Sequence, residues 1–289
     1  MPSPDGQFID LPGRGIRLHY RDWGGKGPDL LLLHGLSSNS RIWDLTAPRL
    51  KLKYRVIALD LRGHGLSDVP ESGYGFTDVN ADVVAFLDAV GLDRVAIAGH
   101  SWGGTVALAL AADHPDQVAG IVMVDGGIIE ISRFSDWETA EKQMIPPDIP
   151  GVPVETFLGF ARQWPHIRDL WTEELGEMVL SNFEIRDGKV YRRLDILRHM
   201  QIARAIYDSR PSELLPRVRC PVLAIVASTT PTNESEQRWH DYKNDGVEIV
   251  RQALPEAEIL IMEDTIHDVP VQRPAELAAA ILGFRDRLA

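Results

Sequence analysis

The sequence contains a single cysteine, Cys220, so an intrachain disulfide is excluded. This cysteine stands directly before an apolar segment, and we expect its thiol to be packed in the interior rather than to take part in chemistry. Stability must then come from a hydrophobic core. A chain of 289 residues with 44% hydrophobic side chains is long enough to bury one.

The sequence also has fewer basic than acidic residues. Lys and Arg number 30 against 42 Asp and Glu, and the formal net charge is −12 at pH 7. Phosphate backbones and anionic lipid headgroups attract basic proteins, so neither a nucleic acid nor a membrane is expected as a partner. We expect a small molecule instead.

Long hydrophobic runs are missing as well. No apolar stretch reaches the roughly 20 residues that a membrane-spanning helix needs. Residues 1–7 carry neither the basic segment nor the apolar stretch of a signal peptide. These features predict a soluble, cytoplasmic protein.

The sequence does contain short aliphatic segments that alternate with helical patterns. An antiparallel hairpin is predicted first, from residues 7–11 and 16–23. Alternation of strands and helices favours an α/β fold with a mostly parallel, doubly wound sheet, here of eight strands. The other six predicted strands are residues 30–33, 55–60, 95–98, 118–124, 221–227 and 258–262.

This alternation stops between residues 128 and 211. The segment is rich in aromatic residues, is broken by prolines and shows no comparable strand. We predict a helical cap or lid, inserted into a core domain formed by residues 1–127 and 212–289. A separate helical subdomain that packs on itself is the alternative.

One stretch has a specific chemical pattern. Residues 99–103 read Gly-His-Ser-Trp-Gly, which fits G-x-S-x-G, and they stand between a short apolar strand and a run of small and apolar residues typical of a helix packed on a sheet. In this context the central serine, Ser101, sits on a sharp turn with its hydroxyl exposed above the sheet edge. Glycines flank it because a side chain there would collide with the neighbouring backbone.

Several motifs in the same order resemble the α/β-hydrolase family, and in particular its serine-nucleophile, esterase/lipase-like branch with a helical cap. They are His-Gly at 34–35, Asp-Leu-Arg-Gly-His-Gly-Leu-Ser-Asp at 60–68, Gly-His-Ser-Trp-Gly-Gly at 99–104, and Ile-His-Asp at 266–268, with Gln-Arg-Pro following at 272–274. The resemblance implies that Ser101 is a nucleophile and that a histidine is its base.

His267 is the only one of nine histidines in the loop after the last predicted strand, where the family places the base. We interpret His34, His64 and His100 as residues that shape turns or pocket walls, with His34 in the substrate pocket. The remaining histidines are interpreted as surface or packing residues. From segment 128–211 we expect Trp137, Trp164 and Trp171 in that pocket.

The acid departs from the commonest family pattern. Thr230 stands where most relatives carry an aspartate, and a threonine cannot stabilise an imidazolium by charge. The other family position is the end of the strand after the nucleophile helix, where Asp125 follows Ser101 by 24 residues. We predict Asp125 as the acid, with Glu234 or an incomplete triad as alternatives; Asp125 as a mere turn residue also stays open.

The resemblance also implies an oxyanion hole made of two backbone N–H groups, those of Leu36 and Trp102. We therefore expect a hydrolase, without cofactor or metal, that cleaves an ester, thioester or lactone of a small, largely apolar substrate. Cleavage of a carbon–carbon bond and perhydrolysis use the same three residues and remain alternatives. A ligand receptor on the same fold is a further one.

Overall fold

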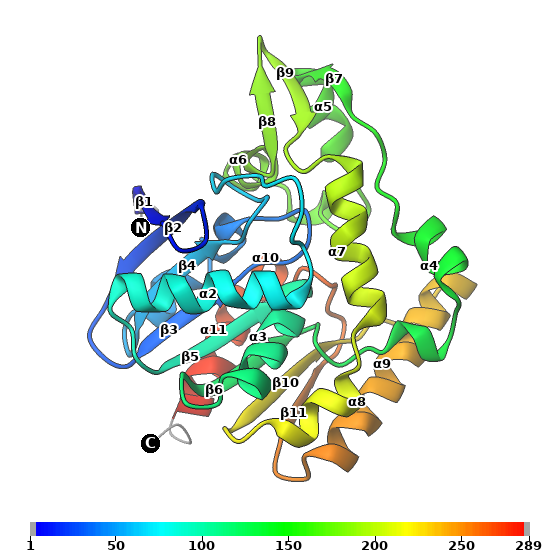
Figure 1. Cartoon of the computed structure of the whole chain (residues 1–289). Coiled ribbons are helices and arrows are strands. Elements are labelled where there is room, and N and C mark those ends of the chain that lie inside the picture. Colours follow the sequence, from blue (N-terminus) through cyan, green and yellow to red (C-terminus); the bar gives the residue numbers. More distant parts are fainter. Residues whose placement is uncertain (1–3, 286–289) are drawn as a thin grey trace.

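The computed structural model describes residues 4–285. Its main feature is one eight-stranded sheet in the order β1-β2-β4-β3-β5-β6-β10-β11 (Figure 1). Strands β1 and β2 pair antiparallel and β2 joins β4 antiparallel, whereas the pairs from β4 onward are parallel. The predicted fold class is confirmed. The strands are β1 (Gly6–Leu11), β2 (Ile16–Gly24), β3 (Asp29–Leu33), β4 (Arg55–Asp60), β5 (Val95–His100), β6 (Val118–Val124), β10 (Val222–Ala227) and β11 (Glu258–Met262).

The sheet is covered on both faces, and β3 shows why its sequence is uniformly aliphatic. Leu31 and Leu33 belong to the hydrophobic cluster on one face, while Leu30 and Leu32 belong to the cluster on the other. Helices α2 (Phe76–Val90), α3 (Trp102–Asp113) and α9 (Glu234–Ala253) contribute to the first cluster, and α1 (Ala47–Leu50), α10 (Val269–Gln272) and α11 (Pro274–Phe284) to the second. A strand in the middle of such a sandwich has no solvent face and needs no polar residue.

Segment 128–211 lies between β6 and the short helix α8 (Pro211–Leu214) that precedes β10. It contains η2 (Ile131–Arg133), α4 (Trp137–Met144), α5 (Val154–Ala161), η3 (Arg168–Leu170), α6 (Glu173–Ser181) and α7 (Ile196–Asp208). Figure 1 shows α7 leading from the top of the molecule back to α8.

The expectation that this segment lacks strands is wrong. A three-stranded antiparallel sheet, in the order β7-β9-β8, is formed by β7 (Pro150–Pro153), β8 (Phe183–Arg186) and β9 (Lys189–Arg192). Strands β8 and β9 are joined by a tight turn in which both Asp187 and Gly188 have positive φ, of 49° and 70°. An Asp-Gly pair is typical of such hairpin turns, so the sequence did hold the signal.

The chain between β3 and β4 forms two short helical pieces, η1 (Ser40–Trp43) and α1. The last described helix, α11, ends at Phe284. Cys220 is partly buried, and burial raises the pKa of its thiol to about 11, in keeping with a packing role.

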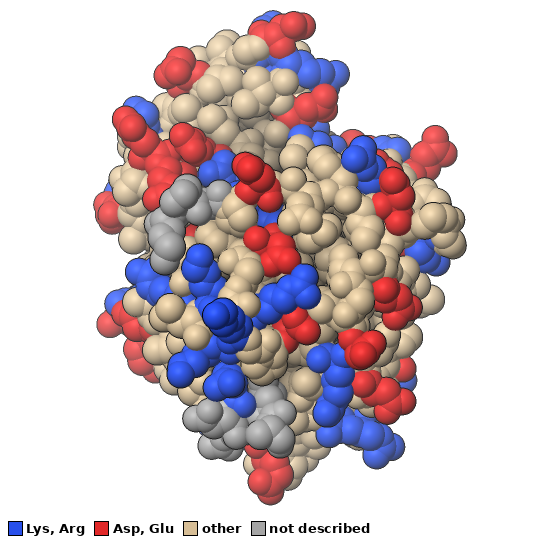
Figure 2. Space-filling view, turned by 90° about the vertical axis from the view of Figure 1, so that its left-hand side faces the viewer, with Lys and Arg blue, Asp and Glu red and all other residues tan. Residues whose placement is uncertain are grey.

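Within residues 4–285, no helix is long and apolar enough to cross a membrane. The charge is unevenly spread at the surface. On the face in Figure 2, which is the side where the N-terminus lies in Figure 1, Lys and Arg gather in the lower half although the chain carries an excess of acidic residues.

Candidate active site

Ser101 lies on the turn between β5 and α3. Its backbone has φ 53° and ψ −119°, a conformation that residues other than glycine rarely adopt. Hydrogen bonds fix the turn on both sides: the Ser101 N–H donates to the Val124 carbonyl at 2.9 Å, and the Gly104 N–H donates to the Ser101 carbonyl at 2.9 Å. Strain of this kind persists only where the surrounding structure enforces it, and it is concentrated at functional sites.

The glycines around Ser101 are required by close backbone contacts. A Cβ atom on Gly99 would lie 2.0 Å from the Gly103 carbonyl oxygen, and one on Gly126 would lie 2.0 Å from the Ser101 carbonyl oxygen. Neither position can accept a side chain unless the backbone moves. Glycine at positions 99 and 126 thus lets the backbone pack closely around the turn that carries Ser101.

Ser101, His267 and Asp125 come together at the carboxyl ends of three parallel strands, β5, β11 and β6. The His267 Nε2 lies 2.9 Å from the Ser101 Oγ, and the His267 Nδ1 lies 2.6 Å from the Asp125 Oδ2. The Asp125 side chain is 1% exposed, whereas that of His267 is 52% exposed. The three side chains therefore form one hydrogen-bonded chain that runs from the interior to an accessible hydroxyl.

Three donors hold the Asp125 carboxylate. The Ala227 N–H donates to Oδ1 at 2.9 Å, while Lys243 Nζ at 2.8 Å and His267 donate to Oδ2. Burial alone would raise the pKa of Asp125, but the hydrogen bond from His267 and the charges of His267 and Lys243 outweigh it and hold that pKa below its usual range. Asp125 is therefore ionised at neutral pH.

An ionised Asp125 can only accept, which fixes the tautomer of neutral His267. The ring carries its proton on Nδ1, and Nε2 presents a lone pair to the Ser101 hydroxyl. Desolvation lowers the pKa of His267, but the hydrogen bond and the charge of Asp125 raise it by more, so the net shift is upward. This arrangement can take a proton from Ser101 and stabilise the resulting imidazolium.

The two alternatives for the acid are placed elsewhere. Glu234 begins α9 with an exposed side chain, and Thr230 is exposed in the loop after β10. Among the described residues, neither side chain hydrogen-bonds to His267.

The loop at residues 34–38 passes close to Ser101. A Cβ atom on Gly35 would lie 3.0 Å from the Ser101 Cβ. Leu36 and Trp102, whose N–H groups we expect to form the oxyanion hole, both line the cavity that contains Ser101. The loop therefore lies where one of its N–H groups can face a substrate bound to Ser101.

His34 lies behind this loop rather than in the pocket, and the sequence-based assignment to the pocket is wrong. It is fully buried; its Nδ1–H donates to the Gly35 carbonyl at 2.7 Å, and its Nε2 accepts from the Leu61 N–H at 3.0 Å. Burial lowers the pKa of His34. Since the C=O of Gly35 and the N–H of Leu36 point in opposite directions across one planar peptide, His34 fixes the direction of the Leu36 N–H.

The cavity at Ser101 has a volume of about 570 Å³. Its walls come from the loops around Ser101, from segment 128–211 and from α9, and its surface is mainly apolar. Sequence reasoning missed the contribution of α9, because an amphipathic pattern does not reveal which site a helix borders. The lining residues outside the core loops are Ile129, Ile131, Met144, His199, Ile206, Glu236, Trp239 and Lys243.

The three tryptophans expected in this pocket do not line it. Trp137 packs against Tyr207, with ring centroids 5.3 Å apart. Trp171 packs on Gly176. Trp164 borders a separate cavity of about 270 Å³, and Leu36 is the one described residue that lines both this cavity and the one at Ser101. The tryptophans stabilise segment 128–211 itself, which is the usual role of large aromatic side chains.

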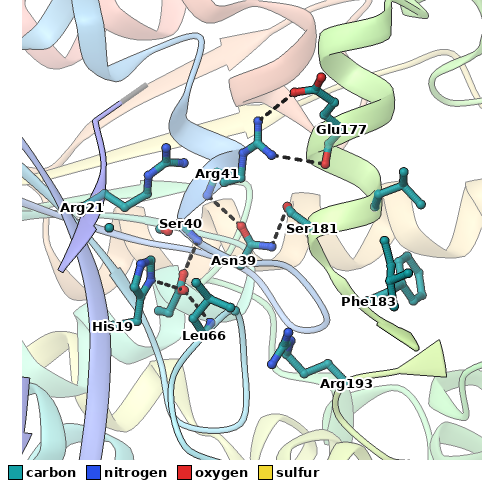
Figure 3. A pocket seen from close by; sticks show the side chains of 15 residues that line it. His19, Arg21, Asn39, Ser40, Arg41, Leu66, Glu177, Ser181, Phe183 and Arg193 are labelled. Atoms are coloured by element: carbon teal, nitrogen blue, oxygen red, sulfur yellow. Dashed lines mark hydrogen bonds and ion pairs between the residues drawn. The ribbon is translucent and has the colours of Figure 1, made fainter. Parts of the chain in front are cut away.

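Another cavity, of about 560 Å³, lies between the core and α6 (Figure 3). Most of its polar side chains are paired with one another: His19 with Asp60, Arg41 with Glu177, and Asn39 with Ser181. Ser101, His267 and Asp125 do not line it. Over the described part of the chain, no group of three or more His, Cys, Asp or Glu residues could hold a metal ion.

Comparison with known proteins agrees with this architecture. The sequence model described as alpha/beta hydrolase fold matches residues 28–163. Together with the strand order and the turn at Ser101, this match shows that the chain has the α/β-hydrolase fold.

Curated relatives match over part of their length. The chain is 38% identical over 101 residues to 2-(acetamidomethylene)succinate hydrolase of Mesorhizobium japonicum, which is 35% of this chain and 36% of the relative. It is 34% identical over 121 residues to epoxide hydrolase 4 of Mus musculus, which is 41% of this chain and 34% of the relative. The chain thus matches about a third of the length of either relative.

Solved structures match over nearly the whole chain. The crystal structure of E-2-(acetamidomethylene)succinate hydrolase superposes with a TM-score of 0.77 at 23% identity, over 98% of this chain and 99% of the other. Est816, described as an N-acyl homoserine lactone degrading enzyme, gives a TM-score of 0.70 at 23% identity, over 96% and 100%. These likenesses show the fold, and the chemistry of this chain has to be argued from its own residues.

Proposed function

We propose that this protein is a serine hydrolase that cleaves an ester, thioester or lactone bond of a small, largely apolar substrate. The observation that carries the proposal is the chain of two short hydrogen bonds from Ser101 through His267 to the buried Asp125. A serine hydroxyl is a weak nucleophile, and a base within reach that is itself oriented by a carboxylate is the means by which it is activated.

In the proposed reaction, His267 Nε2 takes the Ser101 proton as Oγ attacks the carbonyl carbon of the substrate. The carbonyl oxygen becomes an oxyanion, and the N–H groups of Leu36 and Trp102 donate to it. The imidazolium then protonates the leaving oxygen or sulfur, and an acyl-enzyme remains on Ser101. Attack by water, with His267 again as base, releases the acid and restores the serine.

The choice of substrate class rests on the cavity and on the nucleophile. An apolar surface with few polar groups favours an uncharged, apolar acyl or alcohol group. Some relatives bear the names epoxide hydrolase and fluoroacetate dehalogenase. By the family resemblance those reactions use a carboxylate nucleophile, and a serine stands at position 101. Carbon–carbon bond hydrolysis and perhydrolysis remain open, as does the function of a ligand receptor.

A panel of p-nitrophenyl esters of rising acyl chain length tests the proposal directly. We expect hydrolysis with a maximum of kcat/KM at a chain length that fills the cavity. A receptor would bind such esters without turning them over, and a protein that hydrolyses none of them, nor any thioester or lactone, would contradict the proposal.

Narrowing the cavity should change the preference for chain length. Ile206 lies on α7 and lines the cavity, so Ile206→Trp should lower kcat/KM for long-chain esters about tenfold or more relative to the acetate ester, because added volume excludes a group of that size. Leu197 lies on the same helix but is 80% exposed, and Leu197→Trp is the matched control. Equal effects of Ile206→Trp on all esters would mean that acyl chains do not occupy this cavity.

Removing the hydrogen bonds by which His34 holds the loop at residues 34–38 should slow the chemical step. His34→Phe keeps a ring in the site but loses both hydrogen bonds, so the Gly35–Leu36 peptide can turn its N–H away from the substrate. We expect kcat to fall about 10- to 100-fold and KM to change less than about threefold. Steady-state kinetics on a variant shown to be folded by circular dichroism would measure this. An unchanged kcat would mean that His34 is not needed to orient the N–H group that binds the oxyanion.

A further inference from the structure

Lys243 donates to the carboxylate of Asp125, at the same oxygen that accepts from His267. It lies within α9, and its Nζ donates to the Asp125 Oδ2 at 2.8 Å and to the Ala227 carbonyl at 2.8 Å. The side chain is 21% exposed and borders the cavity at Ser101. A single ammonium group therefore links the ends of β6 and β10 beside the carboxylate that orients His267.

The position of Lys243 is set by close packing of α9. A Cβ atom on Gly246, one turn further along, would lie 2.7 Å from the Ile128 carbonyl oxygen, so this helix approaches the chain just after Asp125 at backbone distance. Neighbouring Tyr242 and Val247 are buried. Lys243 is therefore held by a rigid helix rather than by a flexible loop, and its contact with Asp125 is built into the fold.

Lys243 also dominates the positive charge of the site. Among the described residues that line the cavity, it is the only Lys or Arg. The other charged groups that act on His267 are Asp125 and Asp268, which favour its protonation. The His100 ring, 4.8 Å from the His267 ring, is neutral because burial lowers its pKa to about 4. His199 lines the same cavity, and burial lowers its pKa to about 4 as well. Glu236, on the same helix as Lys243, lines the cavity as well.

We propose that Lys243 is a positioning residue that holds the Asp125 carboxylate against His267 and, by its charge, limits how strongly that carboxylate stabilises a protonated His267. This proposal for Lys243 rests on the proposed serine hydrolase function of Ser101, His267 and Asp125. The same Asp125 oxygen serves both cations, so Lys243 competes with the imidazolium for one negative charge. The result is a base that stays unprotonated, and thus able to accept the Ser101 proton, to a lower pH than Asp125 alone would permit.

The test is the pH dependence of Lys243→Met, which removes the charge and keeps the length of the side chain. Without the ammonium group the imidazolium is stabilised, so the pKa of His267 rises and more of the enzyme is inactive in weak acid. We expect kcat/KM at pH 6, relative to its own plateau near pH 8, to fall about three- to tenfold below the wild-type ratio. The plateau itself should fall by about tenfold or less, because Asp125 remains present.

Two further variants make the result specific. Lys142→Met removes an exposed lysine that pairs with Glu138 on its own helix, and it should leave the pH profile unchanged. Lys243→Gln provides a second neutral variant if Lys243→Met does not fold. A Lys243 variant that is slower but keeps the wild-type pH profile would overturn the proposal, since a merely structural role would not shift the acid limb.

A titration of His267 by NMR separates this inference from the proposed function, because it needs no substrate. The imidazole midpoint should move to higher pH in Lys243→Met and stay in place in Lys142→Met. If Ser101→Ala retained full activity while this midpoint moved, the proposed function would fail and the role of Lys243 would stand. An unmoved midpoint would overturn the role of Lys243 alone.

Discussion

Replacing Ser101 by alanine is expected to lower kcat by about a million-fold, and replacing His267 by alanine should have an effect of similar size. In the proposed mechanism Ser101 supplies the oxygen that attacks, and His267, 2.9 Å away, is the only described group that hydrogen-bonds to that oxygen as a base. The residual rate would come from the oxyanion donors and from substrate binding, neither of which requires the serine hydroxyl.

The double variant should be scarcely slower than either single variant, because the two residues act as one unit. Steady-state kinetics on purified protein would measure all three, and thermal unfolding would show that the fold is kept. Multiplicative losses in the double variant would mean that Ser101 and His267 act in separate steps. Substantial activity in Ser101→Ala would reject the mechanism.

The second large effect is expected at Asp125. Asp125→Asn should lower kcat by about three to four orders of magnitude with the fold intact. An amide can donate to the His267 ring and hold it in the tautomer whose Nε2 carries the proton, so that no lone pair faces Ser101. The change also removes the charge that stabilises the imidazolium and leaves Lys243 with a neutral partner.

Glu234→Gln is the matched control for this prediction, since it also exchanges a carboxylate for an amide near the same strand ends. Glu234 is exposed and makes no hydrogen bond to His267 among the described residues, so kcat should fall less than about tenfold. A larger loss in Glu234→Gln than in Asp125→Asn would transfer the role of the acid to Glu234.

Much of the fold could be predicted because the buried sheet imposes a strong pattern on the sequence. Residues 30–33 are all leucine because both faces of β3 are covered, and a run of this kind between turn residues is typical of a central strand. The small sheet β7-β9-β8 escaped prediction because its strands have only four residues each and are half exposed. Strands so short leave no clear alternation.

The residues proposed for catalysis could be selected from sequence because each follows a strand, and parallel strands deliver their ends to one edge of the sheet. The cavity walls could not be selected in this way. Trp239 and Lys243 reach the site from one face of α9, and His34 hydrogen-bonds to the Gly35 carbonyl from outside the cavity. Such roles depend on the relative placement of distant elements, which a local pattern does not encode.

Labelling with a fluorophosphonate probe tests the central claim most directly, because the probe reacts covalently with an activated serine and spares an ordinary one. The account predicts one adduct per chain, located by mass spectrometry on the peptide that contains Ser101, and much slower labelling of His267→Ala. Absence of labelling in the folded wild-type protein, or the same labelling in Ser101→Ala, would contradict the claim that Ser101 is the activated nucleophile.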